Sequence, residues 1–130
     1  MGIIEHVANL LDQVDIKYTR EENELLMRWQ TDHFEDLKIR IVPNNDESWL
    51  YIVVPFASVD QIEESKRNQF FFAMLKESWR VDGVKFAINE DDDIIIIAET
   101  NDTDLTGEEI QILVGHVVHA CDTLWEIYPS

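Results

Sequence analysis

The feature that most constrains the fold is a change of hydrophobic period in the last third of the chain. Two apolar runs, residues 84–89 and 94–98, flank the acidic segment 90–93, a pattern typical of a β-hairpin. From residue 107 to 128, apolar residues recur every three or four positions, which is the spacing of one helix face over about five turns. The sequence therefore predicts two strands followed by a long amphipathic helix.

The upstream half predicts one helix and three strands. Apolar residues at three- and four-residue spacing indicate a helix over residues 3–14. Alternating residues indicate strands over 24–31 and 36–42, and the apolar run 49–56 indicates a strand that is covered on both faces or meets a partner. Because the links between these runs are short, an antiparallel meander is the simplest topology.

A second helix is predicted between the meander and the hairpin. Ser58 and Gln61 have capping-box spacing, which predicts a helix over residues 60–79. Its first half is polar apart from Ile62, whereas its second half, FFFAMLKESW, is apolar around most of the circumference. Such a helix is packed on more than one side, so we expect either deep burial within the domain or contact with a second subunit.

The chain is strongly acidic, with a net charge of −17 from 27 acidic and 10 basic residues, and no Lys or Arg follows Lys85. Nucleic acids and anionic membrane surfaces are bound mainly through Lys and Arg, so we expect neither as a partner. The excess charge favours solubility and also suits a basic or apolar polypeptide partner. The single cysteine, Cys121, excludes an intrachain disulfide and favours a cytoplasmic location. Its place on the apolar stripe predicts burial.

No pattern typical of catalysis, cofactor binding or metal binding is present in the sequence. The four glycines are isolated, and no serine or cysteine lies in a nucleophile motif. His116 and His119 lie three residues apart on the last helix, but no third ligand accompanies them, so we interpret both as solvent-facing. We therefore expect no catalytic residue, no cofactor and no metal.

Candidates for contact with another protein lie on the third strand and the second helix. Core packing is expected to explain most of the four tryptophans, but Trp49 and Tyr51 share a strand face that can serve as a binding surface. The predicted protein-binding or dimer-interface residues are Trp49, Tyr51, Val53, Phe70, Phe71, Met74 and Leu75. We interpret the hairpin and the last helix as scaffold.

The order helix, three strands, helix, two strands, helix resembles the type III secretion chaperone fold, and in particular the YbjN-type family of bacterial sensory transduction regulators. The residues that carry this likeness are Gly83-Val84-Lys85-Phe86-Ala87-Ile88, Ile94-Ile95-Ile96-Ile97-Ala98-Glu99, Leu105-Thr106-Gly107-Glu108-Glu109 and Cys121-Asp122-Thr123-Leu124-Trp125. One departure is Asp91-Asp92-Asp93 at the hairpin tip, where an Asp-Gly turn is expected. The resemblance implies a small, acidic, non-enzymatic and often dimeric protein that holds another polypeptide.

The expected fold is α+β, ordered α-βββ-α-ββ-α, with an antiparallel five-stranded sheet packed with three helices in one domain over residues 1–130. The leading hypothesis is a cytoplasmic, homodimeric, protein-binding module of chaperone-like or regulatory type. The first alternative is a small ligand-binding protein or enzyme with a pocket between sheet and helices, lined by His33, His116 or His119. The second alternative is a subunit of a larger assembly.

Overall fold

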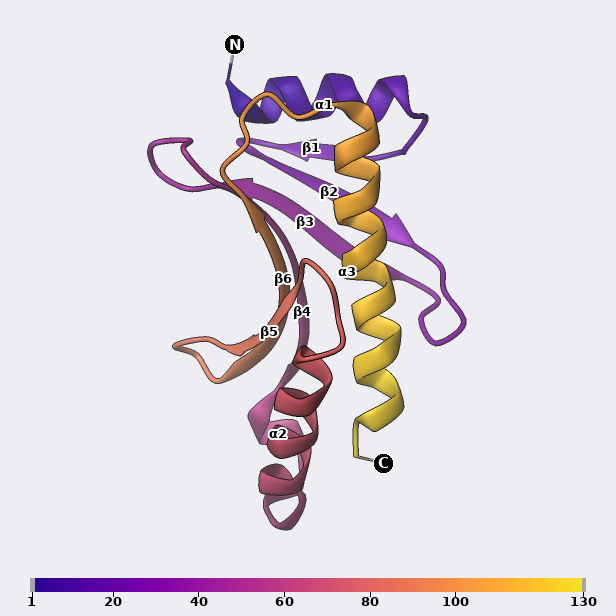
Figure 1. The fold of residues 1–130 in the computed structure, drawn as a ribbon, viewed down its shortest axis with the longest axis vertical. Helices are drawn as coiled ribbons and strands as arrows, with labels where there is room; N and C mark the ends of the chain where they lie inside the picture. The colour runs from indigo at the N-terminus through magenta and orange to yellow at the C-terminus, as the bar shows by residue number, and fades with distance from the viewer. Residues whose placement is uncertain (1, 130) are drawn as a thin grey trace.

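A computed structural model describes residues 2–129 of the chain, and within them it places three α-helices, one short 3-10 turn and six strands (Figure 1). In chain order the elements are α1 (Ile3–Gln13), β1 (Thr19–Glu21), β2 (Glu24–Trp29), β3 (Leu37–Pro43), β4 (Leu50–Ser58), η1 (Val59–Gln61), α2 (Glu64–Ser78), β5 (Lys85–Ile88), β6 (Asp93–Thr100) and α3 (Gly107–Ile127). This arrangement confirms the predicted α+β class and the predicted order of the helices and longer strands.

The sheet is antiparallel throughout, and its strand order is β1-β2-β3-β4-β6-β5. The prediction of five strands was wrong by one, because Thr19–Glu21 pairs with the start of β2 and adds a sixth strand at one edge. This segment has no apolar residue and is exposed along its length, so no alternating pattern marks it in the sequence. The meander β2-β3-β4 and the hairpin β5-β6 are as predicted.

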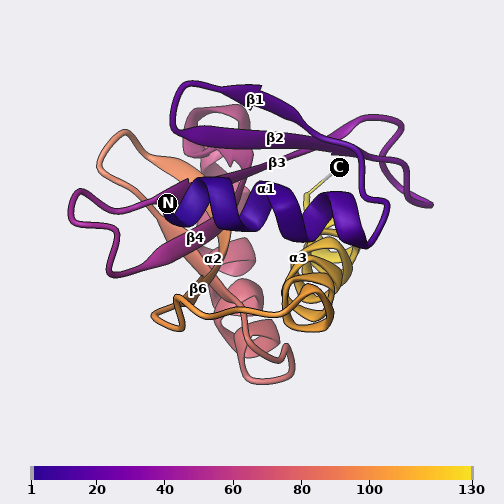
Figure 2. The same cartoon turned by 90° about the horizontal axis from the view of Figure 1, so that it is seen from above.

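One face of the sheet forms the core with α1 and α3. Strand alternation and register place apolar residues from four strands side by side in continuous rows, for example Leu25, Ile41, Ile52 and Ala98. Helix α1 packs against β2 and β3, and α3 packs against β4 and β6. Figure 2 shows α1 lying roughly parallel to β1 and β2, with α3 viewed nearly along its axis. Burying each large aliphatic side chain in this layer contributes about 1.5–3 kcal/mol.

Helix α2 begins later than predicted. The capping box is present, since the Ser58 N–H donates to Gln61 Oε1 and the Ser58 hydroxyl accepts from Asp60 N–H, but it caps the short turn η1. The α-helix then begins at Glu64, after Ile62 adopts an extended conformation and buries its side chain. The polar residues that follow Ile62 therefore form the first turns of a helix with few buried positions.

Helix α3 begins as predicted. The Thr106 hydroxyl accepts from the Glu109 N–H at 3.2 Å, and the Glu109 carboxylate accepts from the Thr106 N–H at 3.3 Å. Six apolar residues of its stripe are fully buried, and Cys121 is among them, as predicted. Within residues 2–129, no helix is long and apolar enough to cross a membrane.

Candidate functional site

The face of the sheet opposite α1 and α3 carries an apolar surface. Register places Val53 beside Ile97, and Pro55 beside Ile95, and the alternation of buried residues along β4 and β6 puts these side chains on the side away from the core. We call this surface the outer patch and define it by the half-buried residues Val42, Tyr51, Val53, Ala87, Ile95 and Ile97. Because these side chains shield one another but are not covered by α1 or α3, they remain available to a partner.

Paired charges border the outer patch. Lys85 Nζ lies 2.9 Å from the Glu99 carboxylate across the β5–β6 pair. On the other side, the Arg40 guanidinium contacts Glu24 and lies 3.6 Å from Glu21. An apolar centre with a charged rim is the usual anatomy of a surface that contacts another protein.

The structure brings two of the predicted strand residues into this patch. Tyr51 and Val53 project from β4 on the outer face, as the predicted alternation requires. Trp49 precedes β4 in the β3–β4 connection, where its backbone N–H donates to Asn44 Oδ1 and its side chain is exposed. Sequence reasoning missed Ile95 and Ile97 as surface residues, because the run Ile94–Ile97 shows no alternation in polarity that separates the two faces.

The predicted helix residues are divided between two faces of α2. Phe70 and Met74 are 2% and 4% exposed and belong to the core, so they are not accessible to a second protein. Phe71 is half-buried, and Leu75 is 69% exposed.

Leu75 belongs to an apolar surface on the far side of α2 from the core. We call it the α2 stripe and define it by Phe72, Leu75 and Trp79, where Phe72 is 62% and Trp79 is 92% exposed. The three residues follow helical spacing, and Lys76 Nζ lies 4.6 Å from the centroid of the Phe72 ring. The expectation that core packing explains most tryptophans was wrong, because Trp49, Trp79 and Trp125 are all exposed.

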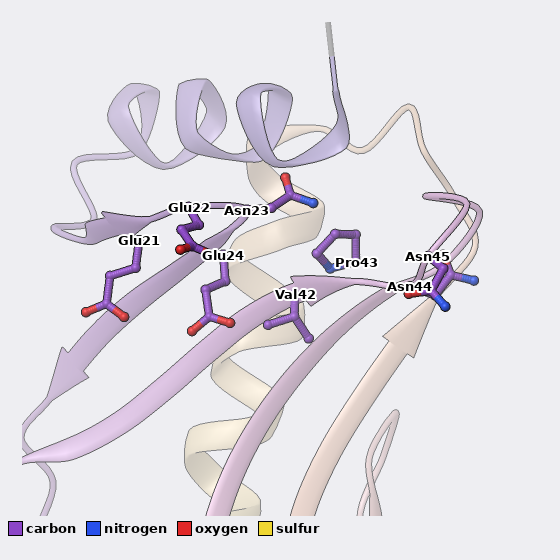
Figure 3. Close-up of a pocket in the computed structure, with 8 residues that line it drawn as sticks. All are labelled: Glu21, Glu22, Asn23, Glu24, Val42, Pro43, Asn44 and Asn45. Carbon is purple, nitrogen blue, oxygen red and sulfur yellow. The ribbon is translucent and has the colours of Figure 1, made fainter.

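An acidic cleft lies at one end of the sheet, between the β1–β2 turn and the β3–β4 connection (Figure 3). Its volume is about 540 Å³, and its lining is Glu21, Glu22, Asn23, Glu24, Val42, Pro43, Asn44 and Asn45. Figure 3 shows Glu21 and Glu24 pointing in the same direction, and both carboxylates pair with Arg40. The lining residues include neither a nucleophile nor a histidine.

The three histidines of the alternative hypothesis do not form one site. His116 and His119 line a cavity of about 190 Å³ with Arg80, Val81 and Asp82. His33 lies elsewhere, with its Nε2 3.6 Å from the Glu126 carboxylate and its ring 6.5 Å from that of Trp125. His116 is half-buried rather than fully solvent-facing, whereas His119 is exposed as predicted. Among residues 2–129, no group of three or more His, Cys, Asp or Glu side chains is placed to hold a metal ion.

The free thiol lies in the core and is unsuited to nucleophilic chemistry. Burial, with a smaller contribution from the nearby Asp122 carboxylate, raises the pKa of the Cys121 thiol from 9.0 to about 12. Because the thiolate is the reactive form, Cys121 is inert in the folded protein near neutral pH.

No protein-family model and no curated protein sequence matches this chain. Solved structures match over nearly the whole length. The structure of the ExsC–ExsE complex aligns with a TM-score of 0.67 at 13% identity, covering 99% of this chain and 98% of that one. The Yersinia pestis type III secretion chaperone SycH, solved with a fragment of YscM2, aligns with a TM-score of 0.61 at 12% identity, covering 95% and 99%. YbjN from E. coli aligns with a TM-score of 0.63 at 10% identity, covering 92% and 86%.

At these identities the likeness establishes the fold. The chain therefore shares the fold of type III secretion chaperones and of YbjN, as the resemblance in the sequence implied.

Proposed function

We propose that this chain is a non-enzymatic, cytoplasmic protein-binding module of chaperone-like or regulatory type, which holds a segment of another polypeptide against the outer patch. The observation that carries the proposal is the apolar, half-buried surface formed by Tyr51, Val53, Ile95 and Ile97 on the sheet face opposite α1 and α3. Nucleic acid and membrane are not its partners, because the net charge is −17 and the rim cations Lys85 and Arg40 are paired with carboxylates.

Structures of the same fold support a polypeptide as the partner. ExsC was solved in a complex with ExsE, and the chaperone SycH in a complex with a fragment of YscM2. Fold alone does not assign function, and the support specific to this chain is its own outer patch. That surface is apolar at its centre and charged at its rim, which suits an extended segment with apolar side chains.

The proposal includes a homodimer formed through the α2 stripe. Burying an aromatic side chain removes about 150–250 Å² from water. Phe72, Leu75 and Trp79 together thus supply on the order of half of the roughly 800 Å² per partner of a typical stable interface. Helix α2 is also nearly neutral, since it holds three of the 10 basic residues and two of the 27 acidic residues. Two copies can therefore approach there with little of the repulsion that the rest of the surface produces.

We call the bound polypeptide the client. It is identified by affinity capture from native cells with quantitative mass spectrometry, using surface variants as bait. Val53→Glu and Ile97→Glu place a charge in the centre of the outer patch. Ile112→Glu is the matched control, because Ile112 is 50% exposed on α3, on the other side of the sheet. We expect a client to be recovered by the wild-type chain and by Ile112→Glu, and to be lost with both patch variants.

Recovery of the same client by all of these baits would show that the outer patch does not hold it. Circular dichroism before capture confirms that each variant is folded, since all three changes are at positions with partial exposure.

A further inference from the structure

The outer face of the sheet, meaning the strand residues that point away from α1 and α3, differs in charge from the rest of the molecule. The chain has 27 acidic and 10 basic residues, yet the strands place as many basic as acidic residues on this face. The basic residues are Arg28, Lys38, Arg40 and Lys85, and the acidic residues are Glu21, Glu24, Asp93 and Glu99. The net charge of −17 therefore belongs to the other surfaces and does not indicate what the outer face binds.

Three of these four cations are paired with carboxylates. Arg40 and Lys85 take part in the rim pairs described above. Arg28 Nη1 lies 3.0 Å from the Asp36 carboxylate. Lys38 is the exception, since its side chain is exposed and forms no ion pair with any residue in the described range 2–129. The outer face thus presents an unpaired ammonium group.

Lys38 lies beside the apolar centre of the outer patch. It precedes Arg40 by two residues on β3, and Arg40 is the direct cross-strand partner of Val53 on β4. Val53 in turn pairs with Ile97 on β6. Residues two positions apart on one strand share a face and are about 7 Å apart. A segment that covers Val53 and Ile97 can therefore place one of its side chains against Lys38.

The surroundings of Lys38 favour a negative side chain at that place. Its direct cross-strand partner is Arg28, so two cations face each other on adjacent strands. Like charges directly opposite one another destabilise a strand pair, and the Asp36 carboxylate is already engaged with Arg28. A carboxylate from a bound segment would reach Lys38 without breaking an existing pair, whereas a Lys or Arg there would add to the repulsion. Covering the site with apolar side chains lowers the local dielectric and strengthens the pair.

We propose that the outer patch holds a client segment in which apolar residues flank an Asp or Glu, and that this carboxylate pairs with Lys38. The inference rests on the proposed polypeptide-binding function and adds the chemical class of the client. It also reverses the expectation from the net charge, which suits a basic partner.

The test selects ligands from a phage-displayed library of random peptides about twelve residues long, which is enough to reach across several strands. The full chain is the bait, and peptides are kept if they bind the wild-type chain but not Val53→Glu, so that they report on the outer patch. We expect Asp and Glu to be at least about threefold more frequent than Lys and Arg in these peptides, relative to the starting library.

Two charge reversals locate the preference. Selection against Lys38→Glu should favour Lys and Arg over Asp and Glu. Lys17→Glu is the matched control, because Lys17 is also exposed and forms no ion pair within residues 2–129, but lies between α1 and β1. It changes the net charge by the same amount and should select the same acidic peptides as the wild-type chain. Circular dichroism verifies that all variants are folded.

A double-mutant cycle then tests the pair itself. One selected peptide is synthesised with its acidic residue as Glu or as Gln, and fluorescence anisotropy measures both against the wild-type chain and Lys38→Gln. Each single change should weaken binding about two- to fivefold, and the double change should be no weaker than either, because both remove the same pair. Salt at about 1 M should remove most of the difference, since it screens an exposed pair.

The outcomes separate this inference from the function on which it rests. Val53-dependent peptides rich in Lys or Arg, or a preference that Lys38→Glu leaves unchanged, would overturn the inference while the outer patch remained a polypeptide-binding surface. A library that yields no Val53-dependent peptide would count against the proposed function as well. A fall in molecular mass on Val53→Glu, measured by light scattering, would assign the outer face to a second copy of the chain and overturn the inference.

Discussion

The Nδ1 atom of His116 lies only 2.9 Å from the position that a Cβ atom on Gly83 would occupy. Gly83 joins α2 to β5 and has a φ of +71°, in the left-handed region that glycine adopts at little cost. The absence of a side chain therefore serves two purposes at this position. It permits the backbone to turn into the hairpin, and it allows α3 to approach the connection closely.

We expect Gly83→Ala to lower the free energy of unfolding by about 2 kcal/mol, because alanine is strained at positive φ and its methyl group collides with His116. Gly115→Ala is the matched control, since nothing lies within 4 Å of a Cβ there and alanine favours the helix by about 1 kcal/mol. Urea unfolding of both variants checks the prediction. Equal stability of the two variants would contradict it, and adding His116→Ala to Gly83→Ala should recover part of the loss.

Phe70 and Phe72 are predicted to differ sharply in their contribution to the free energy of unfolding, although they are two residues apart. Phe70 is 2% exposed, and its ring packs edge-on against Tyr128 with centroids 5.4 Å apart, whereas Phe72 is 62% exposed. We expect Phe70→Ala to destabilise the fold by about 3–4 kcal/mol and Phe72→Ala by less than about 0.5 kcal/mol. Chemical denaturation of the two variants, extrapolated to a common low protein concentration, measures the difference. Similar losses would mean that Phe72 is buried in the monomer.

The dimer proposal predicts that charge on the α2 stripe separates two subunits. At about 100 μM we expect the wild-type chain to be a dimer and Leu75→Glu/Trp79→Glu to be a folded monomer, because both side chains are exposed and contribute little to the core. Light scattering gives the molecular mass. Ile112→Glu changes an exposed apolar residue of α3 and should leave the mass unchanged. A wild-type chain that is monomeric at this concentration would rule out the interface.

The raised pKa of the Cys121 thiol predicts that the folded protein loses stability at high pH. Its pKa is about 12 in the folded protein and near 9.0 when the thiol is exposed by unfolding. Between these values the unfolded chain releases a proton that the folded protein retains, so the free energy of unfolding falls as the pH rises from about 9 to about 12. Cys121→Ala should show a shallower decline over this range.

A second measurement isolates the thiol. Ellman's reagent at pH 8 should react with Cys121 only after denaturation, because the folded protein both buries the thiol and keeps it protonated. Rapid reaction under native conditions would show that the core around α3 opens readily.

Much of the fold could be predicted from local pattern. The stripe of α3, its capping box at Thr106 and the alternation of β2 and β3 all predict the observed elements, because each depends on residues close in sequence. Strand β1 could not be predicted, since Thr19–Glu21 has no apolar residue and is held as a strand only by pairing with β2. Residues 60–63 were assigned to α2 because the capping box at Ser58 has the same spacing whether it begins a 3-10 turn or a long helix.

The candidate surfaces were predicted only in part. Tyr51 and Val53 follow from strand alternation, and Leu75 from the apolar half of α2. Ile95 and Ile97 were missed, and Phe70 and Met74 were assigned to an interface although they are buried. The run Phe70–Phe72 is uniformly apolar, so its periodicity does not indicate which ring enters the core.

Local periodicity thus determined most of the segments that become helices and strands and, for α1 and α3, which face is buried, since both properties arise within a few neighbouring residues. Tertiary structure alone decided that β4 pairs with β6, that no helix among residues 2–129 covers the outer patch, and that β5 is an edge strand. These features depend on which distant segments meet, and the hydrophobic pattern of an isolated strand is the same whether its outer face or edge is covered or open.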